Sequence, residues 1–195
     1  MKKTNIILLR HGQTHWNVEK IWQGTSESEL TPMGRKQALD TKSVLDKIEL
    51  DFTYVSPLKR TIQTMDIVLN NRIIPYKEIN DLKEIHLGIW EGKKHEDIKI
   101  SNREQSDNFF FNQDKFNVKG SETYYDLQKR VVKVLDDIFL KHEGQTVLVV
   151  SHCMSIKVAL AYYSNIQMNE LNKINNPKNA ELITLIKEKD VIRIA

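Results

Sequence analysis

The chain of 195 residues contains one cysteine, four prolines and seven glycines. A single cysteine, Cys153, cannot form a disulfide within the chain, which excludes a disulfide-stapled scaffold. The longest apolar runs, such as residues 147–150, are far shorter than the roughly 20 residues of a membrane span. Near the N-terminus only residues 6–9 are apolar, whereas a signal peptide needs about 7–15 such residues. We therefore expect a cytoplasmic protein with no membrane partner.

The chain also lacks a strong excess of either charge. Its 29 Lys and Arg against 26 Asp and Glu leave a formal net charge of +3. This charge is too mild for a dedicated nucleic-acid-binding protein. Hydrophobic residues at 40% and charged residues at 28% are typical of a globular protein. The length suits one domain, so we expect residues 1–195 to form a single domain without a nucleic-acid partner.

Short apolar segments alternate with helical patterns along the chain. Residues 5–9, 52–55 and 147–150 are typical of strands buried on both faces, and residues 182–186 and 191–194 predict edge strands. Apolar residues spaced by three and four predict helices that begin at Thr31, near Pro57 and at Ser121, with another over residues 156–163. Pro57 is expected just inside the start of the second of these helices. This alternation predicts an α/β fold, a three-layer α/β/α sandwich around a mostly parallel sheet.

Residues 80–119 interrupt the alternation. The segment is polar and irregular, and Gly88 and Gly92 punctuate it. We expect an excursion above the sheet that can form a lid. It contains three successive phenylalanines, residues 109–111, for which packing of the excursion onto the sheet is favoured over a hydrophobic substrate wall.

Basic side chains follow three of the predicted strands. Arg10 and His11 follow the first, Arg60 the second and His152 the third. Because ligands of open α/β sheets bind beyond the carboxyl ends of the strands, these side chains should face one crevice. Arginine offers phosphate a permanently charged fork, and histidine can act as a nucleophile toward phosphorus. The pattern alone leaves this reading and ordinary capping or surface roles about equally open.

Blocks of sequence spread over nearly the whole chain resemble the histidine phosphatase superfamily, the phosphoglycerate mutase-like fold. An Arg-His-Gly signature lies within residues 9–17, and further blocks match at residues 22–24, 30–38, 56–64, 82–92 and 149–152. Residues 120–123, Gly-Ser-Glu-Thr, resemble the family's Gly-Glu-Ser segment with the order altered. A lone Arg-His-Gly would be weak, whereas these blocks in chain order are specific.

The resemblance implies a role for each matching residue. His11 would take the phosphoryl group as a phosphohistidine, and must attack as a neutral imidazole whose other nitrogen donates to a fixed acceptor. Glu84 would protonate the leaving oxygen and then activate water. Arg10, Arg60 and His152 would surround the phosphoryl oxygens and supply the charge compensation, so no metal and no cofactor are expected. The substrate-binding residues would be Gly12, Gln13, Thr14, Asn17, Gln23, Gly24 and Cys153.

Two positions depart from the family pattern. Cys153 stands where glycine is usual, so that a side chain enters a crowded spot, and Gln13 stands where glutamate is common. Neither departure removes a chemical group that the mechanism needs. We therefore expect hydrolysis of a small phosphomonoester, which would be the protein's partner; whether the chain forms a homodimer stays open.

Two alternatives stay open beside the phosphatase. One is a 2,3-bisphosphoglycerate-dependent phosphoglycerate mutase, and the other is an inactive phosphate-binding regulatory module. Mutases of this family resemble one another in supplying paired arginines from the excursion. Residues 101–119 contain no arginine pair and have zero net charge, which favours the phosphatase, although Lys93 and Lys94 keep the mutase open.

Overall fold

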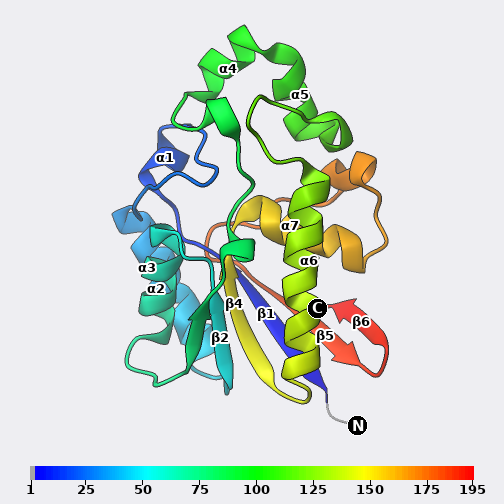
Figure 1. The fold of residues 1–195 in the computed structure, drawn as a ribbon. Coiled ribbons are helices and arrows are strands. Elements are labelled where there is room, and N and C mark those ends of the chain that lie inside the picture. The colour runs from blue at the N-terminus through cyan, green and yellow to red at the C-terminus, as the bar shows by residue number, and fades with distance from the viewer. Residues whose placement is uncertain (1–2) are drawn as a thin grey trace.

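The computed structural model describes residues 3–195. Within this range a six-stranded sheet has the order β3-β2-β4-β1-β5-β6 (Figure 1). The strands are β1 (Thr4–Arg10), β2 (Phe52–Val55), β3 (Tyr76–Glu78), β4 (Thr146–Ser151), β5 (Leu182–Glu188) and β6 (Val191–Ile194). The pairings among β3, β2, β4 and β1 are parallel, whereas β5 and β6 are antiparallel. The prediction of a mostly parallel sheet is confirmed.

Helices cover both faces of the sheet. Successive strand residues point to opposite faces, so Leu9 and Val150 join one apolar cluster with α2 (Pro32–Leu45) and α3 (Lys59–Leu69). Leu8 and Val149 join the other cluster, with α6 (Tyr124–Lys141) and α7 (Cys153–Tyr163). The predicted three-layer α/β/α sandwich is therefore confirmed. In residues 3–195 we find no helix with the length and apolar character needed to cross a membrane.

Helix starts follow the side chains that can cap them. The Thr31 hydroxyl accepts a hydrogen bond from the Gly34 amide ahead of α2, as predicted. The prediction that Ser121 opens α6 is wrong, because Thr123 is the N-cap and exchanges two hydrogen bonds with Asp126. The Ser121 hydroxyl instead accepts from the amide of Val118.

Two features of the sheet and of α3 differ from the expectation. Of the two predicted edge strands, β6 alone lies at an edge, because β5 lies between β1 and β6. The opposite edge is β3, which was not predicted. β3 has three exposed residues, too few to give a periodic pattern. Pro57 precedes Leu58, the N-cap of α3, and so lies outside that helix rather than just inside it.

The excursion at residues 80–119 is more regular than expected. It contains α4 (His95–Ser101) and α5 (Arg103–Phe111), which lie above the carboxyl ends of the parallel strands, at the top of Figure 1. Phe109 is buried and packs against Trp22, Trp90 and Tyr124. Phe109 therefore packs the excursion against α6 and the Trp22 loop rather than onto the sheet as predicted, and Phe110 and Phe111 are exposed. Polar surface residues concealed these short helices from the periodicity analysis.

Candidate active site

His11 lies directly after the carboxyl end of β1 and is 3% exposed. Its Nδ1 lies 2.7 Å from the carbonyl oxygen of Gly12. A carbonyl can only accept, so Nδ1 carries the proton and Nε2 keeps its lone pair. Burial, followed by the charges of Arg60 and Arg10, holds the pKa of His11 well below its usual value. The imidazole is therefore neutral at pH 7, with one nitrogen free to attack.

The loop that carries His11 is fixed against α2 and α3. The Gly12 amide donates to the Thr64 hydroxyl over 3.1 Å, and that hydroxyl donates to the Arg60 carbonyl over 2.7 Å. A Cβ on Gly12 would lie 2.4 Å from the carbonyl oxygen of Gly34. Only glycine allows this backbone approach, and the acceptor for His11 is therefore held in place. Thr64 belongs to a block that resembles the family, but no role was predicted for it.

Arg60, at the start of α3, is a buried cation in the centre of the site. Its Nε donates to Nδ1 of His152 over 3.2 Å, and its two Nη atoms each donate over 2.7 Å, to the carbonyls of Ser26 and Gly24. These bonds use three of the five N–H donors of a guanidinium. Burial lowers the pKa of Arg60 to about 10, so the side chain stays charged at pH 7.

His152 brings the end of β4 into the same site. Its ring centroid lies 5.3 Å from that of His11. Because Arg60 is the donor to Nδ1, the neutral ring carries its proton on Nε2, which lies 2.7 Å from the Ser56 hydroxyl. Burial and then the charge of Arg60 lower the pKa of His152 well below its usual value. His152 therefore orients Arg60, and the Ser56 hydroxyl in turn fixes the His152 ring. No such role was predicted for Ser56.

Arg10 is held by a segment near the C-terminus. One Nη donates to the Pro177 carbonyl over 2.6 Å, whereas the buried Nε has no hydrogen-bond partner among the described residues. The Ala180 amide donates to the Arg10 carbonyl, and the Asn179 side chain donates over 3.1 Å to the His11 carbonyl. A buried cationic N–H without a partner is a donor available to an anion. Pro177, Asn179 and Ala180 belong to none of the recognised blocks, and nothing in the sequence marked them.

Glu84 reaches the site from the beginning of the excursion. Its carboxyl oxygens accept hydrogen bonds from the amides of Met154 (3.0 Å) and Ser155 (3.2 Å) in the first turn of α7, and from the amide of Ile85 (3.0 Å). Amides at a helix N-terminus lack intrahelical partners, so these donors fix the orientation of the carboxyl group. Because His152 is the N-cap of α7, these bonds place Glu84 beside the histidine pair.

The predicted binding residues just after His11 serve mainly to shape the loop. The Thr14 hydroxyl accepts from the Asn17 amide, and Asn17 Oδ1 accepts from the Thr14 amide over 3.0 Å, as a cap for α1 (His15–Val18). Since Oδ1 already accepts this hydrogen bond, Nδ2 is the donor of the Asn17 side chain that is not used in the cap. Gln13 accepts from the Thr31 hydroxyl through Oε1, so its side chain faces α2.

Gln23 and Gly24 form the opposite side of the site. The carbonyl of Gly24 accepts from Arg60, and its φ of +53° suits glycine. A Cβ at this position would lie 2.2 Å from Oε1 of Glu91, so glycine is needed for both reasons. The Oε1 of Gln23 is buried without a hydrogen-bond partner among the described residues.

Cys153 is the first residue of α7 and is buried. Burial raises the pKa of its thiol to about 11. Oxidation and alkylation proceed through the thiolate, which is scarce at pH 7 with such a pKa. The departure from the family glycine therefore places an unreactive thiol beside His152.

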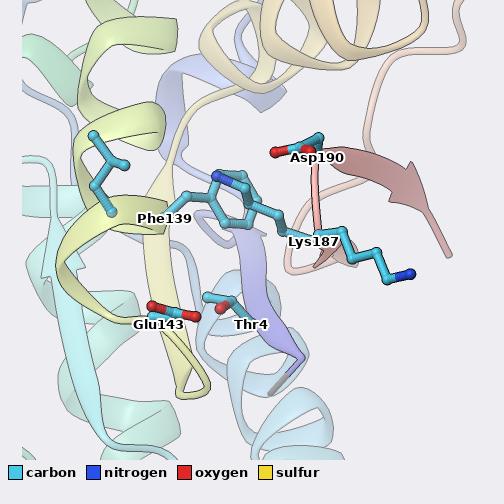
Figure 2. Close-up of a pocket in the computed structure, with 7 residues that line it drawn as sticks. Thr4, Phe139, Glu143, Lys187 and Asp190 are labelled. Atoms are coloured by element: carbon cyan, nitrogen blue, oxygen red, sulfur yellow. The ribbon is translucent and has the colours of Figure 1, made fainter. Parts of the chain in front are cut away.

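A hollow of about 440 Å³ is lined by none of these side chains (Figure 2). It is lined by Thr4, Phe139, Leu140, Glu143, Lys187, Lys189 and Asp190. Thr4 begins β1, so the hollow lies at the amino ends of the parallel strands, whereas ligands of such sheets bind at the carboxyl ends. Among residues 3–195 no group of three or more His, Cys, Asp and Glu side chains is arranged to hold a metal ion.

The two buried neutral histidines should make the protein less stable in mild acid. Both folded-state pKa values lie below the usual value of 6.5, so below about pH 6.5 the unfolded chain binds protons that the folded chain does not. As the pH is lowered through this range, the free energy of unfolding should decrease by up to about 1.4 kcal/mol per pH unit for each histidine. Urea unfolding at pH 7.5 and 5.5 measures this loss. A His11→Asn, His152→Asn double variant should lose less on acidification, and an equal loss in both proteins would contradict the assignment.

Comparison with known proteins assigns the chain to a family. The family described as histidine phosphatase superfamily (branch 1) matches residues 6–195. A metal-independent phosphoserine phosphatase of Arabidopsis thaliana is 35% identical over 152 residues, which cover 76% of this chain and 64% of that protein. A 2,3-bisphosphoglycerate-dependent phosphoglycerate mutase of Blochmanniella pennsylvanica is 27% identical over 216 residues, covering 94% and 93%. The solved structure of Bacillus stearothermophilus YhfR has a TM-score of 0.95 at 32% identity, covering 98% of this chain and 95% of that one.

These similarities agree with the motifs from which the family was predicted. The higher identity is to a phosphatase rather than to a mutase, which makes the mutase the less favoured alternative. The TM-score and the near-complete coverage of both chains confirm the phosphoglycerate mutase-like fold. The chain belongs to the histidine phosphatase superfamily, branch 1.

Proposed function

We propose that the protein is a phosphatase of the histidine acid type, which hydrolyses small phosphomonoesters through a phosphohistidine on His11. The observation that carries this proposal is the state of His11. Its Nδ1–H is bound to a carbonyl, its Nε2 is unprotonated, and burial together with Arg60 and Arg10 keeps it neutral. An anionic substrate placed between the two arginines meets this lone pair directly.

In the first step, Nε2 of His11 forms a bond to phosphorus while the bond from phosphorus to the leaving oxygen breaks. Glu84 gives its proton to that oxygen, a contribution of about 10²–10⁴-fold for a general acid. Arg10 and Arg60 stabilise the charge on the equatorial oxygens, which is the main task in phosphoryl transfer. The Nδ1–H of His11 stays on the Gly12 carbonyl throughout.

In the second step, water attacks the phosphohistidine. Glu84, now a carboxylate, takes a proton from the water as its oxygen bonds to phosphorus. The bond between phosphorus and Nε2 of His11 breaks, inorganic phosphate leaves, and both His11 and Glu84 return to their starting states. Arg10 and Arg60 supply charge compensation in both steps, and the neutral His152 orients Arg60, so the proposed cycle uses no metal or cofactor.

The substrate is proposed to be a small phosphomonoester, and neither nucleic acid nor a membrane takes part. Phosphoserine is the first compound to assay, because the 35% identical relative is named for that activity and for metal independence. A mutase substrate carries a second anionic group, which needs basic residues to bind it. Residues 101–119, which include α5, have zero net charge and no arginine pair for this purpose.

Turnover assays separate the phosphatase from both alternatives. In EDTA, the purified protein should release phosphate from phosphoserine or p-nitrophenyl phosphate over many turnovers, and should form little 2-phosphoglycerate from 3-phosphoglycerate with catalytic 2,3-bisphosphoglycerate. Rapid 2-phosphoglycerate formation with negligible phosphate release would identify a mutase. Vanadate binding without any turnover would identify an inactive phosphate-binding module, and activity lost in EDTA but restored by a metal would refute metal independence.

A further inference from the structure

Arg130, on α6, uses all of its N–H donors on one short stretch of backbone and one carboxylate. Nε and Nη2 donate to the two carboxylate oxygens of Glu122 over 2.6 and 2.8 Å. Nη1 donates to the carbonyls of Asp81 (2.7 Å) and Lys83 (2.8 Å), and Nη2 donates to the carbonyl of Glu84 (3.0 Å). These hydrogen bonds satisfy the five donors of a guanidinium.

The stretch that Arg130 binds has no strand or helix to fix Glu84. Glu84 follows a single 3-10 turn, Asn80–Leu82, and its neighbouring carbonyl, that of Lys83, also accepts from the Ser155 hydroxyl over 2.8 Å. Glu84 is thus held from two sides, with its carboxylate on the first turn of α7 and its carbonyl on Arg130.

α6 gives Arg130 a rigid base. Its neighbours Leu127 and Val131 are buried in the larger apolar cluster, and the Arg130 and Glu122 side chains are only 19% and 16% exposed. The planar fork of arginine fits several acceptors at once, whereas lysine offers a single point of charge. The ion pair with Glu122 fixes the plane of the guanidinium, and the remaining donors then fix the backbone at residues 81–84.

We propose that Arg130, oriented by Glu122, is a positioning residue for the proton transfer by Glu84. This inference rests on the proposed function, in which Glu84 protonates the leaving oxygen. A proton donor must lie within hydrogen-bond reach of the oxygen it serves, and a misplacement of about 1 Å costs about 10²-fold in rate. Loss of the Arg130 fork frees the Glu84 backbone while leaving Arg10, His11 and Arg60 untouched.

Substrates with different leaving groups test this proposal. Phosphoserine leaves as an alcohol and needs the proton, whereas p-nitrophenolate is a stable anion that needs it little. Arg130→Lys should lower kcat/KM about 10²-fold for phosphoserine and less than about 3-fold for p-nitrophenyl phosphate. kcat/KM is the right quantity because it reports the steps up to phosphohistidine formation, before Glu84 acts on water. Lys129→Met, an exposed neighbour on α6, is the matched control and should change neither value.

Glu122→Gln tests the same positioning role if the Arg130→Lys variant does not fold. It removes the charge that orients Arg130 and should reduce the phosphoserine value selectively, by a smaller factor. Equal losses on both substrates in the variants would show a merely structural role and overturn the proposal, as would unchanged kcat/KM for phosphoserine. A wild-type protein that hydrolyses neither substrate would refute the proposed function itself, a result distinct from either of these.

Discussion

Replacing His11 by alanine should slow phosphate release by about 10⁴-fold or more, the scale expected when a covalent nucleophile is removed. The substitution deletes the Nε2 lone pair and leaves the buried cations Arg10 and Arg60 in place. Vanadate or phosphate should therefore still bind to the variant. Steady-state phosphate release and a vanadate titration measure the two expectations separately.

His142→Gln is the matched control for this substitution. His142 also follows an element end, but it packs on Phe52 and Tyr54 near the amino end of β2, and its Nε2 contacts the Tyr54 hydroxyl. The glutamine can keep that contact, and phosphate release should stay within about 2-fold of wild type, as for substitutions remote from the reacting groups. Full activity in His11→Ala would remove His11 from the mechanism.

Replacing Arg60 by methionine should lower kcat/KM by about 10³-fold, because in the proposed mechanism this buried cation stabilises the charge on the transferring phosphoryl group. Two carbonyls, those of Gly24 and Ser26, lose their donors in the same step. His152 loses the donor to its Nδ1, so the histidine pair is also less well oriented. The affinity for vanadate should decrease together with kcat/KM, because the Arg60 charge would stabilise both the bound anion and the transition state.

Arg72→Met, at a half-buried arginine, separates this loss of activity from the general cost of removing an arginine that donates to backbone carbonyls. Arg72 likewise donates to two carbonyls, those of Leu45 and Ile48, over 2.8 Å each, but it lies outside the site. Both variants should unfold at lower urea concentrations, and only Arg60→Met should lose kcat/KM and vanadate binding. A comparable kcat/KM loss in Arg72→Met would show that destabilisation explains the effect.

Much of the fold could be predicted because β1, β2 and β4 are buried on both faces. Such strands are continuous apolar runs, and the helices between them carry apolar residues at helical spacing on their buried faces. Together these two patterns predict helices on both sides of a sheet. The features that were missed leave weaker traces. β3 has three exposed residues, and α4 and α5 bury only a few side chains each, so local polarity conceals them. Thr123 rather than Ser121 is the N-cap of α6, because Thr123 and Asp126 form a reciprocal pair of hydrogen bonds.

The site was predictable where residues follow strand ends or match family blocks. His11, Arg10 and His152 are examples of the first kind, and Glu84 could be found only by resemblance, because it follows an irregular turn. The supporting groups left no such signal. Pro177 and Asn179 reach the site through a turn some 168 positions from Arg10 and His11, and no local pattern encodes such a contact. The donors of Arg130 reach the backbone at residues 81–84 only once α6 is packed.

Trapping the covalent intermediate tests the central claim most directly. Wild-type protein mixed briefly with a phosphorus-labelled substrate and quenched in base should carry up to one phosphoryl group per chain. The group should be stable in base and labile in acid, and peptide mapping should place it on His11. The same protocol on His11→Ala should give no label. Steady turnover without any phosphorylated protein, or a label on His152 instead of His11, would contradict the mechanism.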